Sequence, residues 1–391
     1  MKRMIIFLLV ALSIYGAANL YIFARSAQAL TSLTAFRWIF FFVFAFLVFS
    51  YPLGRILFVH IRNGFSAFLM RVGALYIALM LMLLMWALAV DLIRLANRLV
   101  NFLPAGLALD GGRMKLVLFL VAYGSSLAVL AAGAWNAARP KITSLDIRLD
   151  KSCPGRQELR IAAASDIHLG VTAGAGRLEK IVSKINALSP DIVFLPGDIF
   201  DESMMAGEEG KLEAAFARLR APLGVFAVVG NHEAYSGLER NIDCLTGFGI
   251  RVLQDEALMI DNSFYVVGRN DPNVRRSGKV RLPLREILEK NGINRKFPVI
   301  LLDHQPIRLE EAAREGVDLQ LSGHTHAGQL FPLNLINKLV YEKNWGYLQK
   351  DKTHFYVSSG AGTWGPPVRT GSRSEIVLVR LLFETGGGSD R

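Results

Sequence analysis

Four long apolar stretches in the first third of this 391-residue chain restrict its fold more than any other feature. They cover residues 4–23, 38–53, 72–90 and 116–138. A bilayer-spanning helix needs about 20 apolar residues, and the second stretch approaches that length when its apolar flanks are included. We therefore expect residues 1–140 to form a transmembrane anchor of four helices.

The four stretches contain no Asp, Glu, Lys, Arg or His. Transporters and proton relays usually carry ionisable residues at membrane depth, so the pattern indicates an anchor or a lipid-contacting platform rather than a conduit. The first stretch follows Lys2 and Arg3, and its alternative is a signal peptide cleaved near Ala27 and Ala29. Its apolar run is longer than that of a signal peptide, which favours a membrane span.

Basic residues lie in the loops on both sides of the expected spans, so the positive-inside rule does not decide their orientation. The formal charge of +11 is compatible with nucleic acid, an anionic substrate or anionic lipid. Much of the excess falls in short loops between apolar runs, and no basic stripe interleaved with aromatic residues is present. We therefore expect contact with membrane lipids and no nucleic-acid partner.

After Pro140 the pattern changes to short β-rich runs that alternate with charged helical segments, which predicts an α/β domain over residues 141–391. Strands are expected at residues 145–149, 159–164, 191–195, 225–229, 264–267, 299–302, 355–358 and 376–381. Helices are expected at residues 178–188, 212–219 and 306–315. The glycine-rich C-terminal tail is expected to be disordered.

Five polar clusters each follow a hydrophobic run of this domain. They are Asp166-Ile-His168, Gly197-Asp198, Gly230-Asn231-His232-Glu233, Asp303-His304 and Gly323-His324-Thr-His326. The loops that leave the strand ends of an α/β sheet converge on one crevice, so these clusters are expected to share a site. Cys153 and Cys244 are too few for a disulfide framework or a thiolate metal cluster.

The residue types in these clusters are those of a metal site. An Asp-x-His pair at a strand end points both side chains to one face, because strand side chains repeat every two residues. The rings of His324 and His326 can serve two neighbouring ions, and Asp198, after a glycine, is placed to bridge them. Asn231 adds an amide oxygen. Imidazole, carboxylate and amide ligands without thiolate suit Mn, Fe or Zn.

In this order the five clusters resemble the calcineurin-like metallophosphoesterase superfamily, over about residues 160–381. The later segment at residues 356–369, Tyr-Val-Ser-Ser-Gly-Ala-Gly-Thr-Trp-Gly-Pro-Pro-Val-Arg, is followed by Glu375 and Ile376. It is similar to a membrane-associated bacterial branch that contains the UDP-2,3-diacylglucosamine pyrophosphatases of lipid A synthesis. The resemblance implies a four-layer α/β/β/α sandwich.

The resemblance also implies a role for each residue of the clusters. One metal ion would be held by Asp166, His168 and His326, the other by Asn231, His304 and His324, with Asp198 bridging. Two such ions lower the pKa of a shared water, orient it and neutralise charge on the phosphoryl oxygens. His232 would not be a ligand, but would contact the phosphate and protonate the leaving oxygen.

Three further residues each have two interpretations, and a fourth departs from the family pattern. Asp201 is either an acceptor behind the metal ligands or a helix cap. Glu233 either orients His232 or lies on the surface. Arg369 is either a bidentate ligand of a substrate phosphate or an ordinary surface arginine. Ala327 stands where the family pattern more often has glycine, which puts the local backbone shape in question.

The predicted function is di-metal-dependent hydrolysis of a phosphodiester or pyrophosphate bond in a membrane-proximal or lipid-linked substrate. One alternative keeps this chemistry on a soluble nucleotide or phosphoprotein. Another is a non-catalytic metal-bound membrane sensor or a small transporter, which the complete ligand set and the uncharged spans oppose. An even number of spans puts the N-terminus and the domain on one side. We expect the cytoplasmic face, where the resembling lipid A enzymes meet their nucleotide-linked substrate.

Overall fold

The computed structural model describes residues 2–104, 109–201 and 208–384, so the glycine-rich tail lies outside the described residues. The chain divides into two compact units, Met1–Gly133 and Ala134–Arg391.

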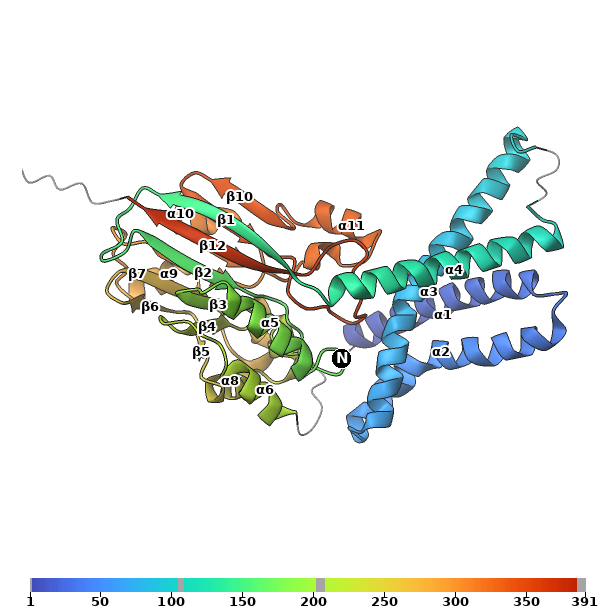
Figure 1. Ribbon diagram of the computed structural model, residues 1–391, viewed down its shortest axis with the longest axis horizontal. Coiled ribbons are helices and arrows are strands. Elements are labelled where there is room, and N and C mark those ends of the chain that lie inside the picture. Colours follow the sequence, from blue (N-terminus) through green and yellow to red (C-terminus); the bar gives the residue numbers. More distant parts are fainter. Residues whose placement is uncertain (1, 105–108, 202–207, 385–391) are drawn as a thin grey trace, which may run out of the picture. The chain divides into compact units, whose positions relative to one another are not determined.

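The described residues of the first unit form four helices, which confirms the four apolar helices expected at the N-terminus. They are α1 Lys2–Ala29, α2 Thr34–His60, α3 Gly64–Val100 and α4 Gly112–Ala137 (Figure 1). Each is long and apolar enough to cross a membrane. The chain is therefore associated with a membrane through these helices.

Close helix packing and one charged cluster characterise this unit. A Cβ atom at Gly73 of α3 would lie 2.4 Å from the backbone nitrogen of Tyr51 in α2, so only glycine permits this approach. Helix α3 continues ten residues beyond the apolar stretch that ends at Val90 and includes Asp91. Asp91 forms ion pairs with Arg25 of α1 and Arg94 of α3. The carboxylate therefore has cationic partners within the unit.

The second unit contains two six-stranded sheets among its described residues. The first has the order β1-β12-β2-β3-β4-β5, with strands β1 Lys141–Leu149, β12 Glu375–Phe383, β2 Glu158–Ala163, β3 Ile192–Pro196, β4 Val225–Val228 and β5 Arg251–Val252. Strands β2 to β5 run parallel, and β12 is antiparallel to β2.

The second sheet has the order β10-β11-β9-β8-β7-β6. Its strands are β10 Gly346–Lys350, β11 Thr353–Val357, β9 Leu319–Ser322, β8 Val299–Asp303, β7 Phe264–Arg269 and β6 Glu256–Ile260. The four central strands are parallel, and β10 and β6 are antiparallel edges.

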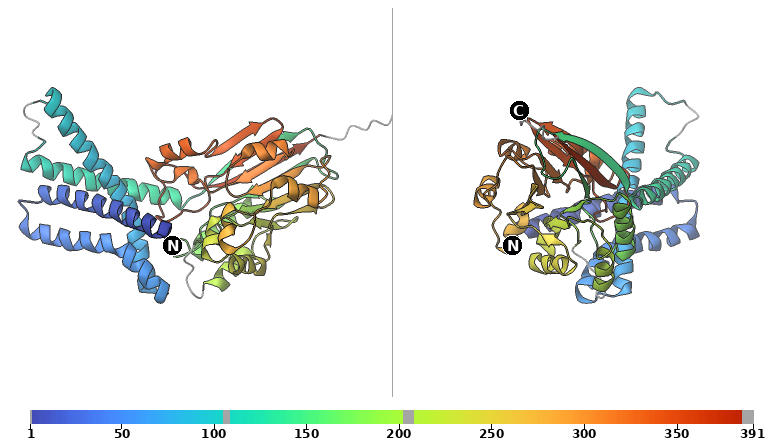
Figure 2. Two further views of the ribbon diagram at one scale, coloured as in Figure 1. Left: turned by 180° about the vertical axis from the view of Figure 1, so that it is seen from behind. Right: turned by 60° about the vertical axis from the view of Figure 1, so that its left-hand side comes forward.

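The described residues of this unit also form seven helices. They are α5 Ala175–Ala187, α6 Glu209–Phe216, α7 Asn231–Ser236, α8 Leu238–Gly247, α9 Leu284–Lys290, α10 Leu309–Arg314 and α11 Leu333–Val340, with two 3-10 turns, η1 Pro272–Ser277 and η2 His326–Gly328. Helices α5, α6 and α8 pack on the first sheet, whereas α9 and α10 pack on the second (Figures 1 and 2).

The strand sequences explain this layering. Along β3, Ile192 and Phe194 point into the core between the two sheets, whereas Val193 and Leu195 point toward the helices. Strand β8 alternates in the same way between the central core and the core under α9 and α10. Because side chains alternate along a strand, a strand buried on both faces reads as a continuous apolar run. The expected four-layer α/β/β/α sandwich is confirmed.

All eight strands and all three helices expected in this unit are present, with bounds shifted by a few residues. Four strands and several helices were not expected. Strand β5 has only two residues, and β9 carries the polar Gln320 and Ser322 at buried positions, so neither forms an apolar run. Helices α7 and α11 have six and eight residues, which is too short for a periodic signal.

Candidate metal centre

The five polar clusters follow parallel strands and converge. Asp166 lies in the loop after β2, Asp198 after β3 and Asn231 after β4. In the second sheet, His304 directly follows β8, and the loop after β9 carries the two remaining histidines. The structure therefore brings all seven predicted metal ligands to one place, from segments that span residues 166–326.

The loop after β2 runs alongside the loop after β3. The backbone nitrogens of Asp166 and His168 donate to the carbonyls of Gly197 and Asp198, both at 3.0 Å. Asp166, His168 and Asp198 have φ values of 52°, 51° and 52°. The strand has therefore ended, and strand alternation is not the reason that the Asp166 and His168 side chains converge. Left-handed backbone at non-glycine residues is costly, and such strain concentrates at functional sites.

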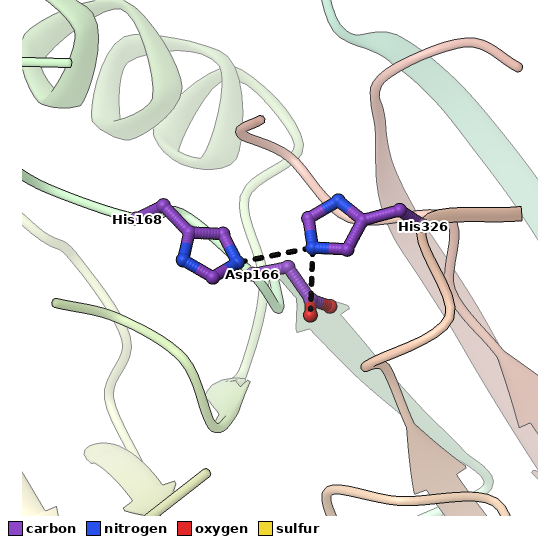
Figure 3. A group of neighbouring side chains, drawn as sticks. All are labelled: Asp166, His168 and His326. Carbon is purple, nitrogen blue, oxygen red and sulfur yellow. Dashed lines mark hydrogen bonds and ion pairs between the residues drawn. The ribbon is translucent and has the colours of Figure 1, made fainter. Parts of the chain in front are cut away.

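The first group of donors consists of Asp166, His168 and His326. Figure 3 shows the Nε2 atom of His326 facing both partners, at 3.0 Å from Nε2 of His168 and 3.5 Å from Oδ1 of Asp166. Burial lowers the pKa of His168 to about 4 and holds the pKa of His326 well below its ordinary value. Both rings are therefore neutral at physiological pH, which is the form that binds metal.

The second group consists of Asn231, His304 and His324. The amide oxygen of Asn231 lies 2.8 Å from Nδ1 of His324 and 3.2 Å from Nε2 of His304. Nδ1 of His304 lies 2.8 Å from the carbonyl of Pro196 and donates to it. This hydrogen bond orients the ring so that Nε2 faces the other donors.

Asp198 lies between the two groups. Its Oδ2 is 3.1 Å from Nε2 of His304 and 3.8 Å from Nε2 of His168. Its Oδ1 accepts the backbone N–H of His232 at 2.8 Å. Burial opposes ionisation, but the neighbouring histidines hold the pKa of Asp198 far below its usual range. An ionised carboxylate therefore faces both sets of donors.

These donors fit two divalent cations. In each of three sets of residues, the possible ligand atoms lie within 4.8 Å of one another. The sets are Asp166, His168 and His326; His168, Asp198 and His232; and Asp198, His304 and His324. The Nε2 atoms of His168 and His326 face each other. Without a metal ion, one of the two nitrogens must donate a hydrogen bond to the other. A cation between the rings would accept the lone pairs of both nitrogens. Among the described residues, the other ring nitrogen of His168 has no hydrogen-bond partner. Nitrogen and oxygen donors without thiolate match Mn, Fe or Zn.

Two glycines make this convergence sterically possible. A Cβ atom at Gly230 would lie 2.1 Å from Oδ1 of Asp198, and one at Gly323 would lie 2.2 Å from Oδ2 of Asp166. Real Cβ contacts are never this short, so each glycine lets a backbone segment lie directly against a carboxylate.

His232 lies beside the two groups of donors, and its pKa is raised, whereas the pKa values of His168 and His326 are lowered. Its Nδ1 lies 3.1 Å from Oδ1 of Asp201, and its ring centroid is 4.7 Å from that of His168. Although burial opposes it, the hydrogen bond to Asp201 and nearby carboxylate charges raise the pKa of His232 to about 9. Asp201 thus contacts His232, which lies beside the predicted metal ligands and is not one of them.

Glu233 is fully buried, so its surface interpretation is wrong. Its carboxylate accepts three backbone N–H groups, from Gly230 at 2.7 Å, Phe200 at 2.8 Å and Asp198 at 3.0 Å. Glu233 therefore joins the loop after β3 to the loop after β4. It contributes to the site by fixing the backbone that carries Asp198.

Arg369 is also buried, with 1% of its surface exposed. Its guanidinium donates to the carbonyls of His326, Ser359 and Gly362 at 3.1, 2.6 and 2.8 Å, and Nη2 lies 3.1 Å from Nδ1 of His326. These donors point into the loops rather than toward a substrate. We infer that Arg369 positions His326, in place of the predicted contact with a phosphate.

The backbone beside His326 accounts for the departure at Ala327. Ala327 has φ 48° and ψ 30°, a left-handed conformation that favours glycine. The change from the family pattern therefore keeps the loop shape at a cost of about 1 kcal/mol.

Arg281, which lies behind His304, belongs to none of the polar clusters that the sequence shows. Arg281 donates to both oxygens of Asp303 at 2.9 and 2.7 Å, and Asp303 directly precedes His304. Both side chains are buried or nearly so. They lie 22 residues apart in the chain, so no local spacing marks them as a pair.

Comparison with known proteins agrees with this geometry. The family model described as calcineurin-like phosphoesterase matches residues 159–328, which include all seven predicted ligands and His232. A protein of Aquifex aeolicus named uncharacterized metallophosphoesterase is 38% identical over 58% of this chain and 87% of its own length.

Two further relatives carry more specific names. A transmembrane protein with metallophosphoesterase domain from Danio rerio is 35% identical over 65% of this chain, and the match spans 60% of that relative, less than two thirds. The UDP-2,3-diacylglucosamine pyrophosphatase LpxG of Chlamydia muridarum is 26% identical over 62% of this chain and 90% of its own length. The resemblance to this superfamily and to the lipid A enzymes is thus confirmed.

The substitution Arg369→Lys tests the positioning role of this arginine. A lysine keeps the charge but cannot reach His326 and three carbonyls together. We expect Mn²⁺ affinity, measured by titrating bound Mn²⁺ with electron paramagnetic resonance, to fall about 10- to 100-fold, the usual effect of losing a residue behind a metal ligand. Arg373→Lys, at an exposed position in the same loop, should leave it unchanged. Unchanged Mn²⁺ affinity with a raised KM would instead support the substrate-binding prediction.

Proposed function

The chain belongs to the calcineurin-like phosphoesterase family, and from this premise we propose that it hydrolyses a phosphodiester or pyrophosphate bond in a membrane-proximal or lipid-linked substrate. Membership makes it a metal-dependent phosphoesterase. The single observation that carries the proposal is the placement of the Asp198 carboxylate between two sets of nitrogen and oxygen donors.

The proposed ligand assignment follows the two groups. Asp166, His168 and His326 hold one ion, Asn231, His304 and His324 hold the other, and Asp198 is shared. When bound, a metal pair supplies a water of lowered pKa and neutralises charge on phosphoryl oxygens. The ions are divalent and of the Mn, Fe or Zn type, because the donors are imidazole, carboxylate and amide.

His232 is the proposed proton donor. Its raised pKa keeps the ring protonated at neutral pH, and Asp201 engages Nδ1. Nε2 is therefore the ring atom that remains to protonate the leaving oxygen of the substrate. Glu233 and Arg369 act on the backbone and on His326 and touch no reacting atom.

Two observations support a lipid-linked substrate. The second unit, Ala134–Arg391, here called the catalytic unit, is continuous in sequence with four helices that are long and apolar enough to cross a membrane. The Chlamydia relative is named for hydrolysis of UDP-2,3-diacylglucosamine, an acylated nucleotide sugar. The runner-up is a soluble nucleotide or phosphoprotein, for which the helices only place the enzyme at the membrane.

Turnover by the purified full-length chain tests the reaction class. With Mn²⁺ and a chromogenic phosphate bis-ester, we expect hydrolysis that Asp198→Asn and His324→Ala abolish, because each removes a metal donor. His232→Asn should bind Mn²⁺ normally yet lose most turnover, because it removes only the proton donor. His354→Ala, a histidine outside the site, is the matched control. Full Mn²⁺ binding without turnover of any ester by the wild-type chain would favour the non-catalytic sensor.

The substrate class is tested by comparing two esters. The full-length chain in mixed micelles should show a higher kcat/KM for a pyrophosphate that carries acyl chains than for the same head group without them. Diluting the acylated ester with inert detergent should lower its rate, since an interfacial substrate is sensed by its surface concentration. Equal kcat/KM values for both esters would support the soluble-substrate alternative.

We propose the cytoplasmic face for the catalytic unit, because a nucleotide-linked substrate is made there. A reporter that is active only in the cytoplasm, fused to the C-terminus, should then be active in cells. A reporter fused to the N-terminus should give the same result, because four spans return the chain to its starting side. Activity only of a reporter that requires export would place the unit on the outer face.

A further inference from the structure

Helix α11 presents an apolar surface outward beside the candidate metal centre. The exposed residues of this surface, here called the α11 surface, are Phe331, Leu333, Leu335, Ile336, Leu339 and Val340. Leu339 has 88% of its area exposed and Val340 has 67%, and α11 contains no buried residue. Contiguous exposed apolar area of this kind marks a contact with another molecule or a membrane.

The polarity of α11 is the reverse of that of an ordinary surface helix. Its two asparagines, Asn334 and Asn337, face the protein. A Cβ atom at Gly328 would lie 2.3 Å from the Cα of Asn334, and the Asn337 amide donates to the carbonyl of Thr325 at 3.2 Å. A helix of a water-soluble domain turns its apolar side to the core. Here the asparagine side of the helix packs on the domain, and the leucines are exposed.

The α11 surface is tied to the metal centre. The loop that ends with His326 and Gly328 is the part of the protein on which α11 packs. The ring of Tyr341, just after α11, lies 6.0 Å from that of His324. Helix α11 therefore lies next to the loop that carries two of the proposed metal ligands.

The α11 surface is also tied to the end of a membrane span. Helix α4 ends at Ala137, and its last residues belong to the second unit. The Asn136 amide donates to the carbonyls of Arg369 and Ser372 at 3.0 and 2.9 Å. In the same loop, the Thr370 hydroxyl accepts the backbone N–H of Phe331 at 3.0 Å. Hydrogen bonds thus connect the residue where the span ends to the first residue of the α11 surface.

The surroundings match the chemistry of a lipid head-group layer. Lys338 on α11 is exposed, and Arg139, which follows the span, lies with its guanidinium 3.4 Å from the ring centroid of Trp135. Trp364, 58% exposed, lies near the site, with its ring 6.1 Å from that of His232. Basic residues attract anionic lipids, and tryptophans favour the membrane interface.

We propose that the α11 surface rests in the lipid layer into which α4 inserts, so that the metal centre opens beside the head groups. The occupant is the bilayer itself, with anionic lipids beside Lys338 and Arg139. This contact does not depend on the proposed hydrolysis. Only its consequence, that the substrate reaches the metal centre from the lipid layer, rests on the proposed function.

Depth measurements on the full-length chain test this contact. The chain is reconstituted in vesicles of phosphatidylcholine and phosphatidylglycerol, with a nitroxide attached at Leu339→Cys. The matched control carries the nitroxide at Val280→Cys, another exposed aliphatic residue of the same unit. Both proteins carry Cys244→Ser, whereas Cys153 is buried and remains.

We expect dissolved oxygen, which concentrates in lipid, to relax the label at 339 more than a water-soluble nickel chelate does, with the opposite order at 280. A label at 339 that the nickel chelate relaxes as strongly as at 280 would show that the α11 surface faces water. Protection of the 339 label from both relaxants would show that protein covers the surface, either the chain's own helices or a second copy. Either result overturns the proposal.

A turnover arm separates this proposal from the proposed function. The double variant Ile336→Ser, Leu339→Ser should lose rate several-fold on an acylated phosphate ester embedded in the vesicles and keep its rate on a water-soluble ester. Equal rates of the variant and the wild type on the embedded ester would overturn substrate entry from the lipid layer. Absence of wild-type turnover on both esters would instead contradict the proposed hydrolysis, while the nitroxide result stands.

Discussion

The ionised carboxylate of Asp198, buried in the loop after β3 and faced by histidines of both donor groups, is the group on which the site depends. An isolated buried charge is too costly to persist, so its surroundings must stabilise it. Glu233 holds the backbone N–H of Asp198, and the histidines His168 and His304 face the Asp198 side chain. Glycine at 230 makes room for the carboxylate. The loop geometry and the placement of the donors therefore both stabilise the negative charge of Asp198.

Much of the fold followed from local patterns. The four N-terminal helices and the eight expected strands are present because long apolar runs and doubly buried strands leave clear signals. The elements that were not expected have weak local signals. Strand β9 buries Gln320 and Ser322, and α11 turns its apolar residues away from the domain. The pattern of apolar residues therefore predicted neither element.

The seven proposed ligands could be named from the sequence because each follows a strand in a short polar cluster, and because the order of the clusters resembles the family. How they meet was not predictable, since Asp166, His168 and Asp198 lie in left-handed backbone rather than on a strand. Arg369 shows the same limit. Its residue type suggested a phosphate ligand, but its burial and its carbonyl partners indicate a support for His326. Long-range hydrogen bonds of this kind leave no spacing in the sequence.

The wide separation of the donors along the chain has a thermodynamic consequence. Donors drawn from residues 166–326 come together only when both sheets have formed, so an unfolded chain offers cations no comparable site. A ligand that binds only the native state shifts the folding equilibrium toward that state by mass action. The conformational stability of the catalytic unit is consequently coupled to the free concentration of divalent cations around it.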